Sequence, residues 1–249
     1  MPRSTLVSPL AQPKVQPLFA QIRELIVERI KSGEWKPGEP LPSETEFGVF
    51  YNVSQGTVRK AIAEMAAENL VVRFRGKGTF VTSQSEEREH SHFFHLVPDD
   101  GAKEPPTTRQ VACRRRKASK EIAAKLGLEP GVEVSVITRV RHIRGKPRVF
   151  ETITVSDAFL PDLCASSPDS LPNELYPHYE QVYDIRVIEA EEHLKAIAAS
   201  EEEAAMLGVE TGAPLLEIDR VALTYERKPV EWRRSLCNSD GYHYVSKLK

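Results

Sequence analysis

Apolar residues in the first third of the chain recur at the spacings of amphipathic helices. Residues 17–33 place several of them three or four positions apart, which predicts a helix that ends at Gly33. The apolar face of this helix contains Leu18, Ile22, Leu25, Ile26 and Ile30. The prolines and glycine that follow within residues 35–42 cannot continue a helix.

Two further helices and a hairpin are predicted after this break. Ser43, with Glu46 three residues later, has the capping-box pattern and opens a short helix that reaches about Tyr51. Ser54 caps the next helix. The apolar face of that helix contains Val58, Ala61, Ile62 and Met65. Two strands then surround a Gly-Lys-Gly turn at residues 76–78, and the whole order predicts a winged helix-turn-helix.

An internal repeat occupies much of the remaining chain. Residues 119–140 align without gaps to residues 200–221, with eleven of the 22 positions identical. Each copy predicts a capped helix, a glycine turn and a strand. A Lys-Pro turn then leads to a second strand that ends near Glu151 in one copy and near Glu231 in the other. Two such units predict an α+β domain with an antiparallel sheet and pseudo-twofold symmetry.

These patterns divide the chain into four segments. Residues 1–12 are rich in proline and are expected to form a flexible arm, and residues 13–82 form the winged helix-turn-helix. The polar, unpatterned residues 83–92 are expected to be a linker. Residues 93–249 form the second domain, which is long enough to bury a core of its own.

Composition and charge add three expectations. No apolar run approaches the roughly 18 residues that a membrane span needs, and the N-terminus lacks the apolar core of an export signal, so a cytoplasmic protein is expected. The cysteines Cys113, Cys164 and Cys237 are widely spaced without a CxxC pair, so neither a disulfide nor a thiolate zinc site is expected. The net charge is −2, but basic side chains gather after Ser54, as in a modular DNA binder.

Several motifs extend across both domains. PLFAQI, SGEWKPGEPLPSETEF, VSQGTVRKAI and ENLVVRFRGKGTFV resemble the DNA-binding domain of the GntR family of bacterial regulators, in its HutC-type branch. LGLEPG, KPRVFE, LGVETGAPLLEIDR and KPVEW resemble the UTRA effector domain, which shares the chorismate lyase fold. The resemblance implies a homodimer on a near-palindromic operator, usually a repressor that a metabolite releases.

The third helix of the first domain is the expected recognition element. Its free backbone N–H groups favour phosphate, Gln55 should lie near base edges, and Lys77 at the hairpin tip can enter the minor groove. The family usually has arginine at Gln55 and a basic residue at Thr45, so we expect a preference shifted toward adenine and a weaker electrostatic contribution. The expected DNA-binding residues are Ser43, Glu44, Thr45, Ser54, Gln55, Gly56, Thr57, Arg59, Arg75, Gly76 and Lys77.

Two arginines in the strand of the first repeat indicate an anion site. Arg139 and Arg141 point to the same face of the strand, and paired guanidinium groups suit a carboxylate or phosphate. The second repeat keeps Arg139 as Arg220 but has Ala222 in place of Arg141. A residue kept in both copies is also explained by a structural salt bridge, so Arg141 is the stronger ligand candidate.

The resemblance to UTRA domains adds further pocket residues. Glu151 and Glu231 match acidic positions that these domains use on effectors, and ion pairing with the arginines is the alternative role. Glu174 and Cys237 replace a serine and a tyrosine of relatives, so the effectors of those relatives cannot be transferred, and an organic acid or other small anion is expected. The expected effector-binding residues are Arg139, Arg141, Glu151, Tyr176, His178, Glu231 and Arg233.

No cofactor, catalytic residue or metal site is expected. His90, His92 and His95 lack supporting carboxylates, and no Walker loop, GxSxG or GxGxxG motif occurs. Two alternative functions stay open: a chorismate-lyase-like enzyme fused to a DNA-binding domain, and a DNA-binding protein without an effector. For a regulator, we expect the effector to act through a hinge at residues 83–92 and so change the spacing of the two recognition helices.

Overall fold

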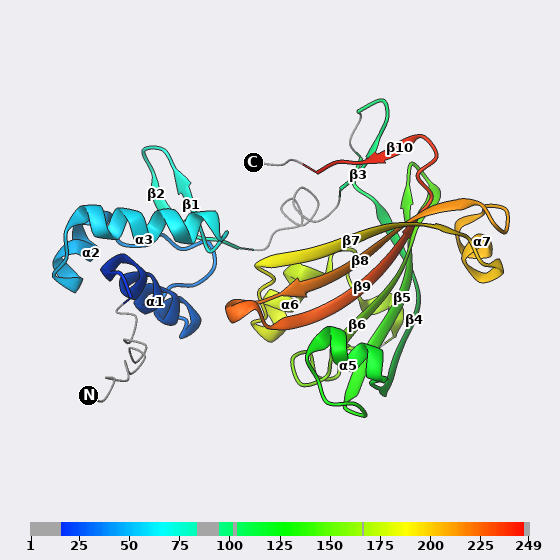
Figure 1. Ribbon diagram of the computed structural model, residues 1–249, viewed down its shortest axis with the longest axis horizontal. Coiled ribbons are helices and arrows are strands. Elements are labelled where there is room, and N and C mark those ends of the chain that lie inside the picture. Colours follow the sequence, from blue (N-terminus) through cyan, green and yellow to red (C-terminus); the bar gives the residue numbers. More distant parts are fainter. Residues whose placement is uncertain (1–15, 84–94, 102–103, 166, 247–249) are drawn as a thin grey trace, which may run out of the picture. The chain divides into compact units, whose positions relative to one another are not determined.

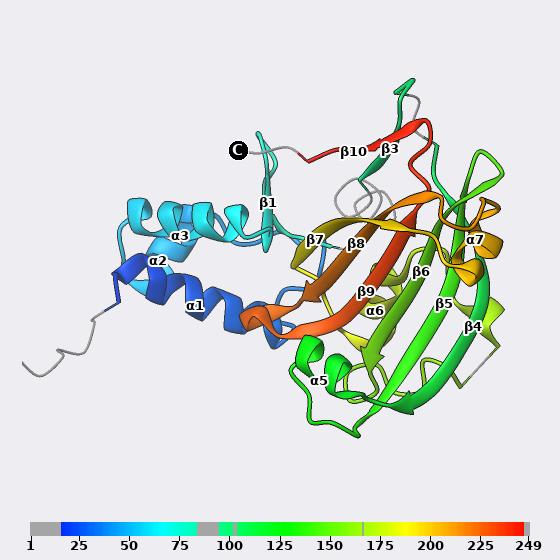
Figure 2. The ribbon, with the colours of Figure 1, turned by 45° about the vertical axis from the view of Figure 1, so that its right-hand side comes forward.

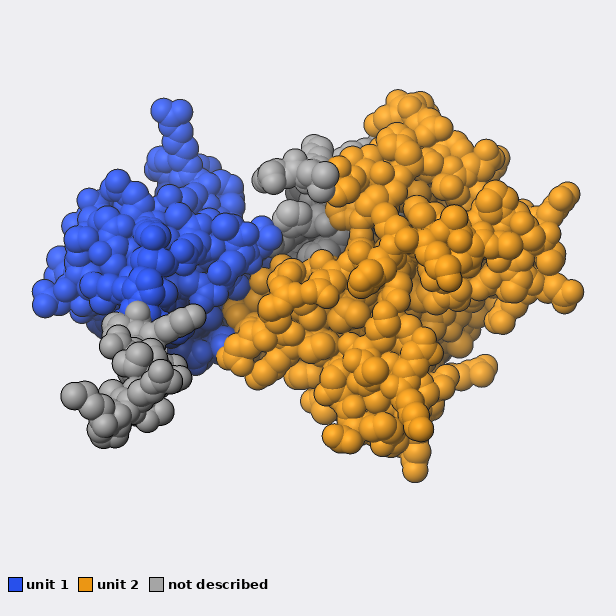
Figure 3. Space-filling model, in the orientation of Figure 1, with its two compact units in different colours: residues 1–83 blue, residues 84–249 orange. Residues whose placement is uncertain are grey.

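The computed structural model describes residues 16–83, 95–101, 104–165 and 167–246. The chain divides into two compact units, Met1–Ser83 and Gln84–Lys249, which Figure 3 distinguishes by colour. The expected arm lies outside the described residues, and so does the expected linker apart from Ser83.

Three helices and a two-stranded hairpin form the first unit (Figure 1). Ser43 Oγ accepts from the N–H of Glu46 at 3.2 Å, and the N–H of Ser43 donates to Oε2 of Glu46 at 2.8 Å, so the predicted capping box is confirmed. Ser54 Oγ likewise accepts from the N–H of Thr57, as a cap of the third helix. The elements are α1 Leu18–Lys31, α2 Glu44–Tyr51, α3 Gln55–Ala67, β1 Val71–Phe74 and β2 Gly78–Val81.

The turn between α2 and α3 is tight because two residues permit it. Asn52 adopts the left-handed conformation at φ 53° and ends α2. A side chain at Gly48 would place its Cβ 3.1 Å from the carbonyl oxygen of Val53, so glycine allows the backbone of the turn to approach the helix closely. The turn brings α3 against α1, and the predicted apolar face of α3 is buried as expected.

The apolar face of α1 is narrower than the sequence predicts. Ile22, Ile26 and Ile30 are buried, but Leu18 and Leu25 are each 50% exposed. Both leucines project from the flank of the helix about 80–100° away from Ile26, at 100° per residue. Val27 on the opposite flank is buried instead, so the helix is rotated toward that side.

A six-stranded sheet in the order β4-β5-β6-β9-β8-β7 forms the centre of the second unit, and all neighbouring strands are antiparallel. A separate two-stranded ribbon pairs β3 with β10. The strands are β3 Leu96–Pro98, β4 Thr107–Lys117, β5 Glu133–Ile143, β6 Lys146–Ser156, β7 Glu189–Ala198, β8 Pro214–Leu223, β9 Pro229–Cys237 and β10 Tyr242–Tyr244. The helices are α5 Lys120–Leu126, α6 Leu175–Tyr183 and α7 Glu201–Leu207, with 3-10 turns at Pro168–Ser170 and Tyr225–Arg227.

The strand order confirms the internal duplication. Strands β4-β5-β6 and β7-β8-β9 occupy equivalent places on either side of the β6–β9 pair. The helices α5 and α7 end at Gly127 and Gly208, which have φ of 62° and 64°. Each glycine packs against the proline of the other repeat: a Cβ on Gly127 would lie 4.0 Å from Pro229, and one on Gly208 would lie 3.8 Å from Pro147.

The second strand of each repeat does not end at its glutamate, so that expectation is wrong. Strand β6 continues to Ser156 with Glu151 in its middle, and β9 continues to Cys237 with Glu231 near its start. Both strands extend because they pair with each other in the centre of the sheet, where each has a hydrogen-bonding neighbour on both sides.

Helices cover the two faces of the sheet unequally. Strand residues alternate between faces, and in β5 Val134 and Val140 belong to the apolar clusters with α5 and α7, whereas Ile137 belongs to the cluster with α6. Figure 2 shows α5 and α7 at opposite ends of the sheet. The single helix α6 packs Tyr176 and Tyr179 onto the other face, on which the buried charges lie.

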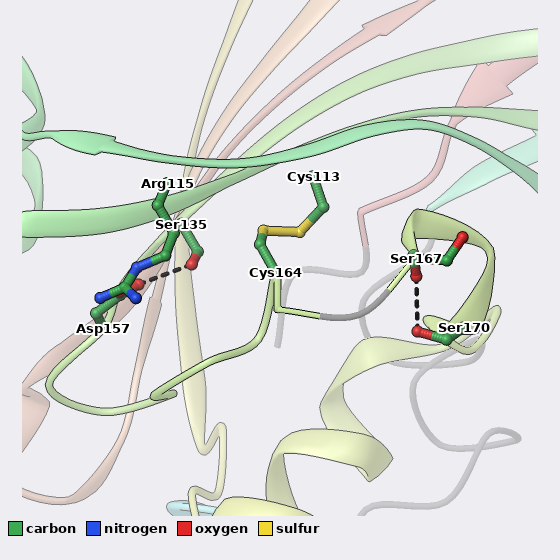
Figure 4. Close-up of a disulfide and its surroundings, with 7 residues drawn as sticks. All are labelled: Cys113, Arg115, Ser135, Asp157, Cys164, Ser167 and Ser170. Carbon is green, nitrogen blue, oxygen red and sulfur yellow. Dashed lines mark hydrogen bonds and ion pairs between the residues drawn. A yellow bond between two sulfur atoms is a disulfide. The ribbon is translucent and has the colours of Figure 1, made fainter.

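A disulfide joins Cys113 to Cys164, which contradicts the expectation from the wide cysteine spacing (Figure 4). The two residues are 51 apart in sequence, but their Cα atoms are only 5.2 Å apart. The expectation failed because sequence distance does not measure distance in space. Strand β4 lies beside β5, and the segment after β6 returns beneath β4, where Arg115 also bonds Asp157 at 2.6 Å.

Among the described residues, no helix is both long and apolar enough to cross a bilayer. The same residues contain no group of three or more His, Cys, Asp or Glu side chains placed to hold a metal ion. Of the histidines considered above, His90 and His92 lie outside the described residues, and the ring of His95 lies 5.2 Å from that of Tyr244.

Reduction of the disulfide should destabilise the second unit. Opening a link that closes a long loop lowers the free energy of unfolding by about 2–4 kcal/mol. Urea unfolding with and without dithiothreitol measures the difference, and the double variant Cys113→Ser/Cys164→Ser is the control, because its stability should not respond to the reductant. An equal response of both proteins would contradict a stabilising role of this link.

Candidate DNA-binding surface and effector site

The N-terminus of α3 is an exposed surface suited to DNA. Ser54 is used as the helix cap, and it also shares a hydrogen bond of 2.9 Å with the hydroxyl of Thr57. Gln55 and Gly56 are exposed on the first turn, and Gln55 Nε2 lies 3.5 Å from Oγ1 of Thr45 on α2. Residues predicted from two helices therefore form one continuous surface.

Glu44 connects the recognition helix to the hairpin. Its Oε2 accepts from Nε of Arg59 at 2.9 Å, and its Oε1 accepts from Arg73 on β1. Arg59 remains exposed, so its guanidinium is held at the surface without being buried. The expected DNA-binding residues included Glu44 and Arg59 but not Arg73. The contact of Arg73 with Glu44 could not be predicted, because only the fold brings α2 beside β1.

The hairpin turn presents Lys77 at its tip. Gly76 and Gly78 have φ of 76° and 115°, which glycine adopts without strain, and the N–H of Lys77 donates to the carbonyl of Phe74 at 3.0 Å. Arg75 and Lys77 are both exposed. The hairpin projects from the first unit in Figure 1, as the wing of a winged helix-turn-helix does.

The predicted effector residues lie mostly in one buried ion-pair network on the α6 face of the sheet. Arg139 donates from Nε to Oε2 of Glu151 at 2.6 Å and from Nη1 to the carbonyl of Asn173 at 3.0 Å. Arg141 pairs with Glu174 at the start of α6. All four charged side chains are nearly inaccessible to solvent.

Glu231 is the most fully satisfied carboxylate of the network. Arg233 donates to it twice, from Nε at 2.8 Å and Nη2 at 3.0 Å, and the hydroxyls of Tyr176 and Tyr179 donate at 3.1 and 2.9 Å. Arg233 also reaches Glu151 at 3.5 Å, so the two halves of the network are joined.

The register shows that the two repeats have different charges at equivalent positions. Arg139 lies opposite Glu151 in the first repeat, whereas Arg220 lies opposite Arg233 in the second. Glu151 is therefore equivalent to Arg233, and the correspondence with Glu231 suggested by the sequence is wrong. The second arginine pair takes its carboxylates from elsewhere, because Arg220 bonds Glu192 of β7 and Arg233 bonds Glu231.

Electrostatics distinguish the members of the network. Burial by itself raises the pKa of Glu151, but Arg139, Arg233 and Arg141 outweigh it and hold this pKa well below its ordinary value. Burial lowers the pKa of Arg233, and Glu231 more than compensates, so that pKa lies well above its ordinary value. The pKa of Arg141 is lowered, by burial and then by the charge of Arg139, so its cation is less stabilised than that of Arg233.

A small pocket, partly open to solvent, lies over this network. Three residues of the network do not line the pocket and support the lining residues from below: Arg139, Tyr176 and Glu231. Its lining is formed by His95, Leu96, Arg141, Val149, Glu151, Glu174, Ile218, Arg220, Arg233, Ser235 and Cys237.

His178 does not join the network. Tyr176 and Tyr179 face the sheet from α6, and His178 lies on another side of this helix, half-buried, with its ring 5.8 Å from that of Tyr183. Burial lowers the pKa of its imidazole. The resemblance to UTRA domains placed His178 in the site, but helical periodicity turns this residue away from the network.

Sequence reasoning gave other lining residues too little weight. Arg220 was assigned a structural role, Glu174 was noted only as a departure from relatives, and Ser235 was not considered, although its hydroxyl donates to Glu151 at 3.3 Å. Cys237 is a buried thiol whose pKa burial raises far above its ordinary value, so it lines the pocket as an uncharged group. The alternation of β9 was the available signal, since Arg233, Ser235 and Cys237 share one face.

Comparison with known proteins decides the family. Residues 18–81 match the family described as bacterial regulatory proteins, gntR family, and residues 102–243 match the UTRA domain. The HTH-type transcriptional repressor NagR of Bacillus subtilis is 31% identical over 236 residues, which cover 93% of this chain and 96% of NagR. The chain belongs to the GntR family. Its first unit is the DNA-binding helix-turn-helix of that family, and its second unit is a UTRA effector-binding domain, as predicted.

Other relatives agree with this assignment of the GntR-family protein. The HTH-type transcriptional regulator GgaR of Escherichia coli K12 is 28% identical over 233 residues, covering 92% of this chain and 90% of GgaR. A crystal structure of the ligand-binding domain of a GntR-family regulator from Bordetella bronchiseptica has a TM-score of 0.61 and 34% identity, covering 64% of this chain and 98% of that domain. PhnF of Mycobacterium smegmatis, at a TM-score of 0.54 and 22% identity over 92% of this chain and 99% of PhnF, shares the fold.

Removing the charge of Glu151 should destabilise the protein in a pH-dependent way. Glu151→Gln removes the buried carboxylate that pairs with Arg139 and Arg233. The free energy of unfolding should fall by about 3–5 kcal/mol at neutral pH. Because the folded-state pKa of Glu151 is depressed, its stabilising effect is complete above the ordinary pKa of 4.5 and is lost as the pH falls below it. The difference in unfolding free energy between wild type and variant should therefore narrow below about pH 4.5.

Chemical denaturation between pH 3 and 7 measures this difference. Glu226→Gln is the control, because Glu226 forms an exposed pair with Lys228 and its loss should change stability by less than about 0.5 kcal/mol. If the difference in unfolding free energy between wild type and Glu151→Gln stays constant from neutral to acidic pH, the pKa of Glu151 is not depressed.

Proposed function

We propose that this GntR-family protein is a homodimeric repressor that leaves a near-palindromic operator when a small molecule with an anionic group occupies the UTRA pocket. The observation that supports it is a pocket lined by the buried guanidinium groups of Arg141, Arg220 and Arg233, in a chain whose first unit is a DNA-binding helix-turn-helix. The names of NagR and GgaR, a repressor and a regulator, point in the same direction.

In the proposed complex, α3 lies in the major groove of operator DNA. The N–H groups at the start of α3 face phosphate, Gln55 and Gly56 face base edges, and Arg59 is oriented by Glu44. The wing contributes Arg75, Gly76 and Lys77 near the minor groove. The caps Ser43 and Ser54 fix the helices that carry these contacts, Thr57 bonds the side chain of Ser54, and Thr45 lies beside Gln55.

A homodimer follows from the energetics of operator binding. One helix-turn-helix reads a short half-site, and two half-sites at a fixed separation give the affinity of a specific repressor. An effector that changes the spacing of the two recognition helices would cost the complex several kcal/mol. In this proposal residues 83–92 transmit the change, and the second domain, residues 93–249, holds the protomers together.

The proposed effector binds without being consumed. Arg141 and Arg233 bind its anionic group by charge-assisted hydrogen bonds, and Glu151 and Glu174 accept its donors. Recovery of the unchanged compound after prolonged incubation would support this role, whereas turnover of chorismate would support the enzymatic alternative.

Exchanging one side chain on α3 should change operator preference. Gln55→Arg should shift the preferred base at one position in each half-site from adenine to guanine, by about 1–3 kcal/mol, because glutamine pairs with adenine and arginine with guanine. Selection of binding sites from random DNA measures the shift. Gln21→Arg is the matched control, with the same exchange on the exposed face of α1. An unchanged preference in Gln55→Arg would remove Gln55 from base recognition.

Neutralising Arg141 should weaken effector binding and leave DNA binding intact. A ligand that raises the unfolding temperature of the wild type should lose at least about tenfold in affinity in Arg141→Met, the loss of one charged hydrogen bond. Arg186→Met is the matched control, because Arg186 forms a buried pair with Glu180 away from the pocket. The idea fails if Arg141→Met responds to the ligand as the wild type does.

A further inference from the structure

The ion-pair network at the pocket is balanced in charge when Glu192, which is only partly buried, is counted. Four arginines lie against four glutamates, and each arginine has a carboxylate partner. These residues are Arg139, Arg141, Arg220 and Arg233, with Glu151, Glu174, Glu192 and Glu231. A site built for a dianion such as a phosphate monoester needs an excess of positive charge, and this network has none.

A ligand that carries only an anion would meet an electrostatic cost in this network. Its anionic group must compete with a glutamate for a guanidinium, and the displaced carboxylate would then be left buried without a cation. A ligand that also carries a cation avoids this cost, because it exchanges one internal ion pair for two new ones. The net charge of the buried region stays the same.

Arg141 and Glu174 form the pair that a ligand can open. Both line the pocket, whereas Arg139 and Glu231 lie below it. In their ion pair Arg141 donates from Nη2 to Oε1 of Glu174, whereas Arg233 bonds both carboxylate oxygens of Glu231. Both hydrogen bonds of Glu174 among the described residues end on Oε1, the second coming from Asn173 at 2.9 Å.

Three apolar side chains also line the pocket, together with the polar residues His95 and Ser235. Leu96 from β3, Val149 from β6 and Ile218 from β8 lie beside the charged residues, and they belong to one apolar cluster. A ligand that fits this lining has a charged end at Arg141 and Glu174 and an apolar portion that packs against these three side chains.

We propose that the pocket takes a zwitterionic, amino-acid-like ligand, with its carboxylate on Arg141, its ammonium on Glu174 and its side chain against Leu96, Val149 and Ile218. The proposal rests on the function proposed above and specifies the class of effector. Arg141, whose pKa is lowered, gains most from an added carboxylate.

Calorimetric titration of the full-length protein tests the ligand class. The probes are the standard L-amino acids with their 2-hydroxy acid and amine counterparts, for example L-leucine, 2-hydroxy-4-methylpentanoate and isopentylamine, together with glucose 6-phosphate. At least one amino acid should bind at least about tenfold more tightly than both of its counterparts, because each counterpart lacks one ion pair. Absence of binding by every amino acid, or tighter binding of a hydroxy acid or of glucose 6-phosphate, overturns the proposal.

Two variants test the position of the ammonium group. Glu174→Gln should weaken amino-acid binding about tenfold and reduce the preference over the hydroxy acid to about one, because the amide cannot pair with a cation. Glu180→Gln, which alters a buried pair outside the pocket, should keep the preference. A preference that survives in Glu174→Gln overturns the assignment.

Operator binding separates this proposal from the proposed function. If glucose 6-phosphate or a hydroxy acid lowers operator affinity and no amino acid binds, the regulator stands and the ligand class is wrong. If an amino acid binds with the expected preference and leaves operator affinity unchanged, the ligand class stands and the proposed function is wrong.

Discussion

Buried charge must be paired, and this constraint determines how the UTRA domain of the protein is built. Glu151 and Glu231 lie in the centre of the sheet, where water cannot solvate them, so arginines must reach them. Arg139 reaches Glu151 from the neighbouring strand β5, and Arg233 reaches Glu231 from the same strand β9. The tyrosines of α6 supply the remaining donors to Glu231, which fixes this helix on the same face. The register of the central strands therefore sets the position of each charge, and the pocket forms where these charges approach the surface.

Duplication and divergence together explain the asymmetry of the site. The two repeats keep their helix caps, terminal glycines and strand order, and each helix packs against a proline of the other repeat. In the ion-pair network their charges differ at two equivalent positions, where Glu151 corresponds to Arg233 and Arg141 to Ala222. A symmetrical scaffold thus contains an asymmetric pocket, which Glu174 helps to line.

Local sequence patterns predicted the elements well and long-range contacts poorly. Caps, glycine turns and apolar periodicity predicted the helix-turn-helix, and the repeat predicted the antiparallel sheet, because each depends on neighbouring residues. The disulfide between Cys113 and Cys164, the partner of Arg141 and the turning away of His178 depend on how distant segments meet. The predicted burial of Leu18 and Leu25 on α1 was wrong for the same reason. Helix α1 has apolar residues on two flanks, and only packing decides which flank is buried.

Coupling between the pocket and the operator is the central claim of this account, and it can be measured from either side. Calorimetry would give the affinity of a pocket ligand for the free protein and for the protein–operator complex. The ligand should bind the protein–operator complex more weakly than the free protein. The factor should equal the one by which saturating ligand weakens operator binding, because linkage is reciprocal. Equal affinity of the ligand for the two forms would contradict the claim.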